Sequence, residues 1–289
     1  TIRISCEGPM SYQFVGEAPV VSAVKDSTVQ ETEEEAISRI RERFEILTDM
    51  TRAATEGSIR AMIVSGPPGV GKSFGVEQEV EKSTLLDQLA GRRVRAEVVK
   101  GSATALGLYS TLYKYSDDNC VVVFDDCDSI LLDDVSLNLL KGALDSGKSR
   151  KISWLADSNM LRREGIPDSF NFKGSVIFIT NLKFDTMKSQ KLRDHLDALQ
   201  SRCHYLDLTL DTMRDKILRI KQIAQDGELF RDYDNIGAVE QEEILGFMNE
   251  NQNRLREMSL RMALKIADLR TSFPENWLKM ARTTCMKPA

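Results

Sequence analysis

The sequence predicts an α/β fold in which a parallel sheet carries a phosphate-binding loop and is followed by a small all-helical domain. Short apolar runs alternate with helical patterns up to about residue 225, and this alternation is typical of a parallel sheet. One apolar run leads through a glycine-rich turn into a helix. After Gly227 no strand pattern follows, and helices are expected near residues 238–250, 256–270 and 274–282.

The composition is that of an ordinary globular protein, since the 289 residues are 42% hydrophobic and 29% charged. A formal net charge of −5 excludes a global basic field for nucleic acid but leaves room for a local basic loop. No apolar run approaches the roughly 18 residues of a membrane span, and the amino terminus has no signal-peptide pattern. Five scattered cysteines without a CxxC pair, with two histidines, make a zinc site unexpected. We therefore expect a cytoplasmic protein with reduced thiols and no membrane partner.

The predicted elements divide the chain into three parts. Residues 1–29 show no sustained periodicity and are expected to form an N-terminal arm. Residues 30–227 are expected to form the nucleotide-binding α/β domain, and residues 228–289 a helical lid domain. The boundary between the last two is placed in the polar segment 226–235.

The first predicted helix begins after residue 31. Ile37, Ile40, Phe44 and Leu47 have the spacing of one helix face, and Gly57 stands where a C-terminal cap is expected. Strands are then expected at residues 61–64, 94–99, 120–124, 151–155, 176–180 and 205–208. Helices are expected from about residue 72, near residues 103–114 and 188–200, around Leu137, Leu140 and Leu144, and around Met213, Ile217, Ile220 and Ala224.

The stretch GPPGVGKS matches the phosphate-loop pattern G-x-x-x-x-G-K-[ST] at every fixed position, between a predicted strand and a predicted helix. Glycines let backbone N–H groups curl around phosphate oxygens, and the helix N-terminus adds partial positive charge. A chance glycine-proline turn is the alternative, and the strand and helix on either side argue against it. The residues expected to bind the nucleotide are Gly66, Pro67, Pro68, Gly69, Val70, Gly71, Lys72, Ser73 and Phe74.

The stretch VVVFDDCD places acids directly after a strand that is apolar on both faces. Because ligands lie at the C-terminal ends of parallel strands, Asp125 is expected to hold Mg²⁺ together with Ser73. Asp126 is expected to polarise the attacking water, with a structural hydrogen bond as the alternative. Asp128 is interpreted as a turn or helix-cap residue, and the next helix is expected to be capped by Asp133 and Asp134.

These motifs together resemble those of the AAA+ ATPases over about residues 35–270, and more narrowly the small AAA-type ATPases encoded by tailed bacteriophages. The resemblance implies ATP and Mg²⁺ as cofactors, ATP hydrolysis, and assembly of identical subunits into a ring, commonly a hexamer. For a phage-encoded protein it implies the host cytoplasm as the location.

Three later positions resemble catalytic positions of this family. Asn181 ends an apolar strand as sensor 1 does and could hydrogen-bond the γ-phosphate or the water; a turn residue is the alternative. Arg202 resembles the arginine finger that enters the neighbouring subunit's site, with Arg193 as the second candidate and a surface arginine as the alternative. Arg261, in the stretch from Ser259, resembles sensor 2 at the start of a lid helix.

One departure from the family pattern concerns Asp126, because the family usually has glutamate at this position. The aspartate side chain is one methylene group shorter than that of glutamate, so its carboxylate reaches about 1.5 Å less far. A second water or a small strand shift could compensate, and otherwise hydrolysis is slow. Some viral helicases of the related superfamily 3 also carry paired aspartates here, and this resemblance favours a nucleic-acid role.

The substrate is expected to contact two loops. Lys100 and Gly101 begin a candidate pore loop that lacks the aromatic residue favoured by protein unfoldases of the family. The insertion 147–174 interleaves basic and aromatic residues that could contact a phosphate backbone and bases, and it resembles a β-hairpin placed before sensor 1 in helicase-type members. The alternative is that Asp157, Glu164 and Asp168 dilute its charge and that the aromatic residues pack under the hairpin. DNA is therefore favoured over a protein substrate, and a slowly hydrolysing assembly switch is the third hypothesis. The candidate contacts in the insertion are Lys148, Arg150, Lys151, Trp154, Arg162 and Arg163.

Overall fold

The computed structural model describes residues 31–184 and 189–288, apart from the side chain of Leu86. The predicted arm, residues 1–29, lies outside the described residues. The residues from Glu33 onward form one compact unit. Within the described residues no helix is long and apolar enough to span a bilayer.

The sheet contains β1 (Ala61–Ser65), β2 (Ala96–Lys100), β3 (Val121–Asp125), β6 (Ser175–Thr180) and β7 (His204–Asp207), and a separate antiparallel pair contains β4 (Lys151–Ser153) and β5 (Ser169–Asn171). The first helices are α1 (Glu33–Thr55), α2 (Lys72–Leu89), α3 (Ala105–Lys114), α4 (Asp128–Leu131), α5 (Asp134–Ala143), α6 (Asn159–Glu164) and α7 (Gln190–Gln200). The last helices are α8 (Met213–Gln225), α9 (Ala238–Glu250), α10 (Leu260–Ser272) and α11 (Trp277–Thr284).

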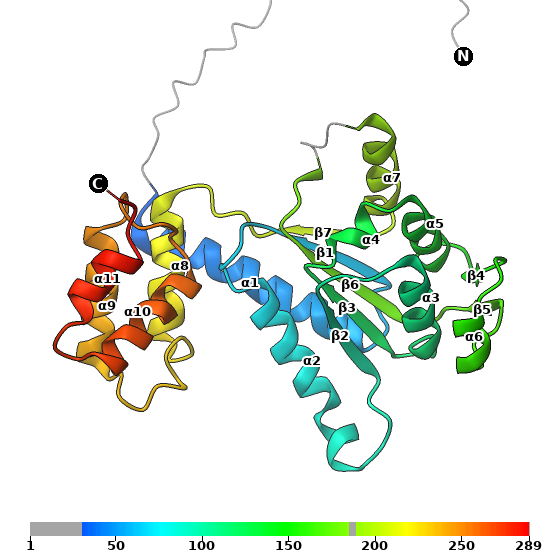
Figure 1. Cartoon of the computed structure of the whole chain (residues 1–289), viewed down its shortest axis with the longest axis horizontal. Helices are drawn as coiled ribbons and strands as arrows, with labels where there is room; N and C mark the ends of the chain where they lie inside the picture. The colour runs from blue at the N-terminus through cyan, green and yellow to red at the C-terminus, as the bar shows by residue number, and fades with distance from the viewer. Residues whose placement is uncertain (1–30, 185–188, 289) are drawn as a thin grey trace, which may run out of the picture. The chain divides into compact units, whose positions relative to one another are not determined.

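The five-stranded sheet is parallel and has the order β2-β3-β6-β1-β7 (Figure 1). In this order β1, β3 and β6 are central, although they are far apart in sequence. Asp125 at the end of β3 lies opposite Ile179, and Ser65 at the end of β1 lies opposite Thr180. The topology therefore places the phosphate loop, the acid cluster and the end of β6 at one edge of the sheet.

The central strands are buried on both faces because helices cover both sides of the sheet. Alternate residues of β3 enter different cores. Val121 and Val123 pack with α1, α2 and part of α8, whereas Val122 and Phe124 pack with α3, α5 and α7. A strand that is apolar at every position, as the sequence shows here, is what this three-layer arrangement requires.

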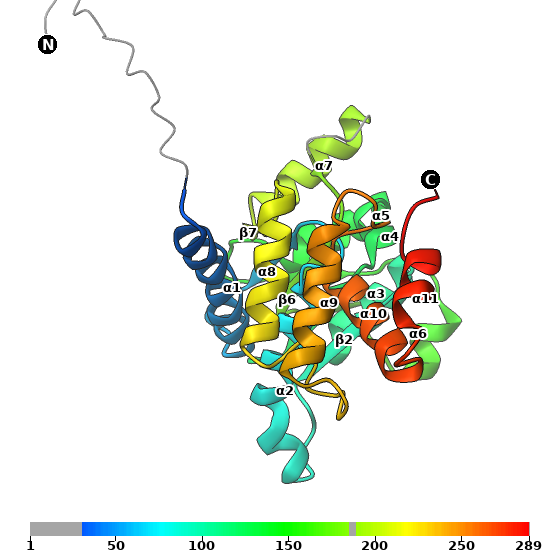
Figure 2. The ribbon, with the colours of Figure 1, turned by 90° about the vertical axis from the view of Figure 1, so that its left-hand side faces the viewer.

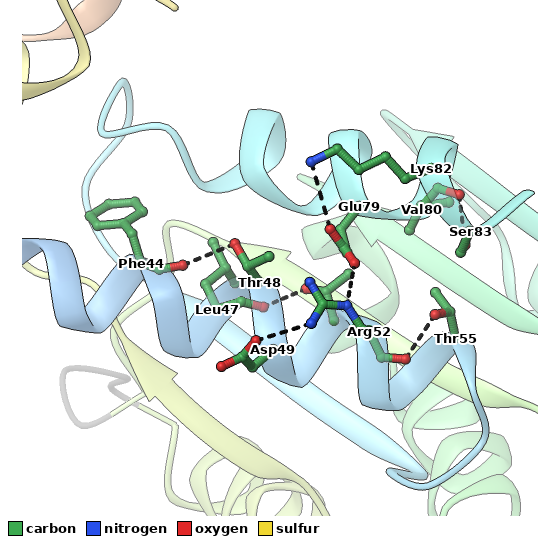
Figure 3. A network of polar contacts seen from close by, with 11 residues as sticks. Phe44, Leu47, Thr48, Asp49, Arg52, Thr55, Glu79, Val80, Lys82 and Ser83 are labelled. Atoms are coloured by element: carbon green, nitrogen blue, oxygen red, sulfur yellow. Dashed lines mark hydrogen bonds and ion pairs between the residues drawn. The ribbon is translucent and has the colours of Figure 1, made fainter. Parts of the chain in front are cut away.

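Helices α1 and α2 are joined by the polar network in Figure 3. The Arg52 guanidinium donates to Glu79 at 2.8 Å, and Glu79 is buried. Asp49 and Lys82 extend the network at 3.4 and 3.9 Å. Because α2 begins at Lys72, this network helps to fix the helix that follows the phosphate loop.

The described residues after Gly227 form helices α9, α10 and α11 (Figure 2), and their role as a lid stays a prediction. These helices have their own core, to which Phe247, Ile266 and Trp277 contribute. Helix α8 contributes to two cores. Its Ile220 lies in the core of the C-terminal helices, and its Leu218 lies in the core between the sheet and helices α1 and α2. The predicted boundary at residue 227 therefore stays a prediction.

Two short helices were not predicted. Helices α4 and α6 span only four and six residues, which is too short for a periodic pattern. The β-hairpin expected in the insertion corresponds to the antiparallel pair of β4 and β5, although α6 lies between the two strands. The helix expected from residue 256 begins instead at Leu260, because the Ser259 hydroxyl accepts a hydrogen bond from the Met262 N–H and caps it. The predicted cap at Asp133 is confirmed, since its carboxylate accepts from the Ser136 N–H at 2.8 Å, and Asp134 lies in the first turn.

Candidate active site

The phosphate loop connects β1 to α2 and is in direct contact with α10. Gly69 and Gly71 have φ values of +76° and +102°, a region that favours glycine. A Cβ atom on Gly69 would lie 2.6 Å from the Cβ of Ser259, and one on Gly71 would lie 3.3 Å from Leu260. The Leu260 N–H also donates to the Gly69 carbonyl at 2.9 Å. The glycines therefore allow the N-terminus of a C-terminal helix to approach the loop backbone.

Lys72 is the central cation of the site and is only 5% exposed. Its ammonium donates to the carbonyls of Gly66 and Pro67 at 2.7 and 2.9 Å and to the side-chain oxygen of Asn181 at 2.8 Å. Burial lowers the pKa of Lys72 to about 8, although the nearby Asp126 carboxylate acts in the opposite direction. The ammonium is thus held at the loop by three acceptors in a water-poor site.

Ser73 and Asp125 lie together at the ends of the phosphate loop and β3, as the sequence predicted. The Ser73 hydroxyl donates to the Asp125 carboxylate at 2.9 Å. Burial raises the pKa of Asp125, and the bond from Ser73 opposes this shift. A hydroxyl and a carboxylate are ligands that suit Mg²⁺, which typically takes few protein ligands together with substrate phosphates. Within the described ranges no group of three or more His, Cys, Asp or Glu residues is placed to bind a metal.

Asp126 has an unusual backbone conformation, with φ of +52°. Its N–H donates to the Ile179 carbonyl at 3.0 Å, and its carboxylate accepts from the Asn181 amide at 2.8 Å. Among residues other than glycine, aspartate and asparagine tolerate this left-handed region best. The backbone therefore gives a physical reason for aspartate at a position where the family usually has glutamate.

Asn181 connects two predicted catalytic residues. Its oxygen accepts from Lys72, and its amide nitrogen donates to Asp126. The neighbouring Thr180 hydroxyl donates to Asp128 at 2.6 Å and accepts from the Leu182 N–H at 3.0 Å. Sequence reasoning missed this pairing and treated Asp128 as a turn or cap residue, but its carboxylate binds Thr180 and so ties the end of β6 to the start of α4.

A cavity of about 620 Å³ lies between the phosphate loop and the C-terminal helices. The site residues in its wall are Lys72, Ser73, Asp126, Asn181 and Arg261. The Arg261 charge contributes to lowering the Lys72 pKa, so the two cations face the same space. The volume falls in the range of small-molecule sites.

On the side of the cavity away from the acid cluster, Phe74 was predicted to bind the nucleotide, whereas Arg231, Tyr233 and Asp268 were not predicted. The Arg231 guanidinium lies 5.4 Å from the centre of the Phe74 ring. The Tyr233 hydroxyl donates to the Asp268 carboxylate at 2.7 Å. An aromatic ring beside hydrogen-bonding groups can accommodate a nucleotide base. In the sequence, these residues lie in a polar turn and on a helix face, without a motif that could have marked them.

Arg202 does not line the cavity of its own chain. It follows α7, is half-buried, and donates to the Ala198 carbonyl. The second candidate, Arg193, donates to Gln190 at 2.7 Å. The assignment of an arginine finger stays a prediction.

The candidate substrate contacts fall into two groups. Several have partners in the fold: Lys100 pairs with Glu77 at 2.7 Å, Arg162 pairs with Asp157, Arg150 donates to the carbonyls of Ala143 and Gly174, and Trp154 packs 5.8 Å from Tyr109. The exposed cations Lys148, Lys151 and Arg163 have no ion pair within the described residues. The packing of Trp154 agrees with the structural alternative for the aromatic residues, and the substrate contacts of the six basic residues stay predictions.

No family model matches the sequence. The chain is 34% identical over 260 residues to the "uncharacterized 36.7 kDa protein in nrdC-mobD intergenic region" of Enterobacteria phage T4, a match that covers 89% of this chain and 78% of that protein. Among solved structures, domain III of the replication initiation protein DnaA from Thermotoga maritima has a TM-score of 0.50 at 10% identity, covering 85% of this chain and 91% of that one. DnaA bound to AMPPCP and single-stranded DNA has a TM-score of 0.45 at 13% identity, covering 88% and 69%. The likeness to the Thermotoga domain shows a shared fold.

Proposed function

Because the chain belongs to the family of the 36.7 kDa phage T4 protein and has the AAA+ fold, we propose that it is a Mg²⁺-dependent ATPase that assembles into a hexameric ring and works on DNA. The work would be that of a helicase, translocase or loader in the cytoplasm of the infected host. One observation carries the ATPase proposal. Lys72, Ser73, Asp126, Asn181 and Arg261 face one cavity of about 620 Å³.

The residues divide the chemistry among them. The loop N–H groups and Lys72 bind the phosphates, and Arg261 adds a second cation to the same space. Ser73 and Asp125 would hold Mg²⁺, which supplies charge neutralisation at the phosphates. Asp126 accepts the proton of the attacking water, and Asn181 orients that water.

The proposed ring rests on Arg202. This arginine follows α7 and does not face the cavity of its own chain. In a ring it can supply charge to the neighbouring subunit's site, where one well-placed arginine stabilises the transition state.

The proposed action on DNA is supported by two features. Lys148, Lys151 and Arg163 of the insertion are exposed and have no ion pair among the described residues. The loop at Lys100 and Gly101 has no aromatic residue with which to grip a polypeptide. Protein remodelling is therefore the alternative that the experiment must separate.

A second candidate function is an ATP-dependent assembly switch that hydrolyses slowly. The hydrogen bond between Asp126 and Asn181 favours it, because it engages one oxygen of the carboxylate that must activate water. The switch would assemble on ATP and hydrolyse it rarely.

The test is the ATPase rate of the assembled protein alone and with single-stranded DNA, duplex DNA or an unfolded protein. We expect acceleration by DNA, with Lys72→Ala protein as the inactive control. Acceleration by the unfolded protein alone contradicts the DNA proposal. ATP-dependent assembly with negligible turnover under every condition favours the switch.

A further inference from the structure

The charge of the chain is distributed unevenly. Residues 251–289 contain eight Lys or Arg and three Asp or Glu, a net charge of +5. The preceding 250 residues contain 31 Lys or Arg and 41 Asp or Glu, a net charge of −10. A cationic segment in an acidic protein indicates an anionic partner.

Three of the eight cations have roles within the fold. Arg261 faces the nucleotide cavity, Lys265 pairs with Glu257 at 3.3 Å, and Arg270 pairs with Glu243 at 2.9 Å. The other five are exposed and have no ion pair in the part of the chain that the structure describes. We call these five the basic lid surface: Arg254, Arg256, Lys279, Arg282 and Lys287.

The backbone brings the two ends of this surface together. Leu255 and Met286 form an antiparallel bridge. The Lys287 N–H donates to the Arg254 carbonyl at 2.8 Å, and the Arg256 N–H donates to the Cys285 carbonyl at 3.0 Å. The segment before α10 and the end of α11 are therefore held side by side, which fixes three cations on adjacent backbone.

Helix α11 supplies the other two cations. Trp277 and Ala281 face the helical core. At 100° per residue, Lys279 and Arg282 lie on the opposite side of the helix, and the exposed Leu278 lies between the two sides. The outermost stripe is thus cationic, unlike that of a helix that inserts into a bilayer, where the outermost stripe is apolar.

The local acids do not neutralise this surface. Glu257 is paired with Lys265, and Asp268 accepts from Tyr233. Glu250 and Glu275 are the exposed acids that flank it in sequence. In the α/β part, by contrast, exposed cations commonly pair with acids.

We propose that the basic lid surface binds the sugar-phosphate backbone of DNA. Guanidinium groups match phosphate oxygens with two parallel hydrogen bonds, and three of the five cations are arginines. Five cations on a braced backbone can contact successive phosphates, whereas a single basic side chain contributes little. This contact goes beyond the proposed ATPase, because it requires neither nucleotide nor turnover, and it places DNA on the helical domain as well as on the insertion.

The experiment measures binding of the full-length chain to a fluorescent oligonucleotide, by anisotropy, at several salt concentrations without ATP. The variant combines Arg254→Gln, Lys279→Gln and Arg282→Gln. The matched control removes the same charge from the insertion, with Lys148→Gln, Lys151→Gln and Arg163→Gln. Each phosphate contact contributes about 0.7 to 0.9 to the slope of log affinity against log salt. We therefore expect the lid variant to lower that slope by about 2 and the affinity at about 0.1 M salt by on the order of 100-fold.

Three outcomes would overturn the proposal. The first is that the lid variant binds DNA like the wild type, and the second is that only the insertion variant loses binding. The third is that the lid variant keeps its affinity for DNA but loses its affinity for phosphatidylserine vesicles or for polyglutamate. Thermal melting and basal ATP turnover show whether the variant is folded, since its three residues are outside the nucleotide cavity. A wild-type protein that binds DNA through this surface but hydrolyses no ATP contradicts the proposed ATPase and leaves this inference standing.

Discussion

Replacing Gly69 with alanine separates the phosphate loop from α10. The new Cβ lies 2.6 Å from the Cβ of Ser259 and 3.1 Å from its hydroxyl oxygen, and neither contact is possible without movement. Ser259 caps α10, so it cannot retreat alone. We expect α10 to move off the loop and to take Arg261 with it.

The magnitude follows from the contacts that are lost. The hydrogen bond from Leu260 to Gly69 contributes about 0.5–1.5 kcal/mol. The cap at Ser259 contributes about 1 kcal/mol where it is disturbed. Alanine at φ of +76° adds strain of about 1–2 kcal/mol. The loss of folding free energy is therefore about 2.5–4.5 kcal/mol. Because Arg261 moves away from the cavity with α10, we expect ATP affinity to fall by on the order of tenfold or more.

The assay combines thermal unfolding with titration of a fluorescent ATP analogue. The matched control is Gly246→Ala in α9, where a Cβ meets no atom within 4 Å. This control should stabilise the protein by about 0.5–1 kcal/mol, because alanine favours a helix interior over glycine. It should leave ATP affinity unchanged.

A second substitution identifies the cause. Ser259→Gly removes the Cβ that blocks alanine at Gly69, and glycine is an acceptable helix cap. The double variant should regain most of the lost ATP affinity, while the backbone strain at residue 69 persists. Unchanged affinity in Gly69→Ala, or no recovery in the double variant, refutes the reasoning.

Three further predictions concern the catalytic residues. Asp126→Asn should abolish ATP turnover yet preserve ATP binding, and turnover by this variant would contradict the catalytic assignment. Asp126→Glu should lower the free energy of unfolding by about 0.5–1 kcal/mol, because glutamate is disfavoured at positive φ. Because the pKa of Lys72 is about 8 without nucleotide and bound phosphate favours the charged amine, ATP affinity should be full below pH 8. Above pH 8 the ATP affinity should fall by up to about tenfold per pH unit. An ATP affinity that stays constant from neutral pH to about pH 9.5 would contradict this role of Lys72. Arg202→Ala subunits should be inactive alone and should regain turnover when mixed with Lys72→Ala subunits, whereas wild-type turnover by Arg202→Ala alone rules out the arginine finger.

Much of the architecture could be predicted because the strongest signals in the sequence are local. The phosphate loop lies between a buried strand and a helix, and β3 is apolar at every position before Asp125. A buried parallel strand imposes that pattern. The convergence of Ser73 with Asp125 follows from the same topology, because Asp125 ends β3 and Ser73 lies in the first turn of α2, directly after the loop that follows β1.

Other features depend on contacts between segments that are distant in sequence. The proximity of Gly69 to Ser259, and the bond between Thr180 and Asp128, arise only when the helices and strands pack. No periodicity signals such contacts. The positive φ of Asp126 was likewise not predictable, and it supplies the reason for aspartate that the sequence alone left open.

The most direct test of the central claim is ATP binding and hydrolysis by the purified chain with Mg²⁺, measured beside Lys72→Ala. The account predicts that the wild-type protein binds ATP with saturation and releases phosphate. It predicts that the variant remains folded but loses binding, because its loop lacks the one buried ammonium that faces the cavity in the described part of the chain. Equal binding and equal phosphate release by the two proteins would contradict it.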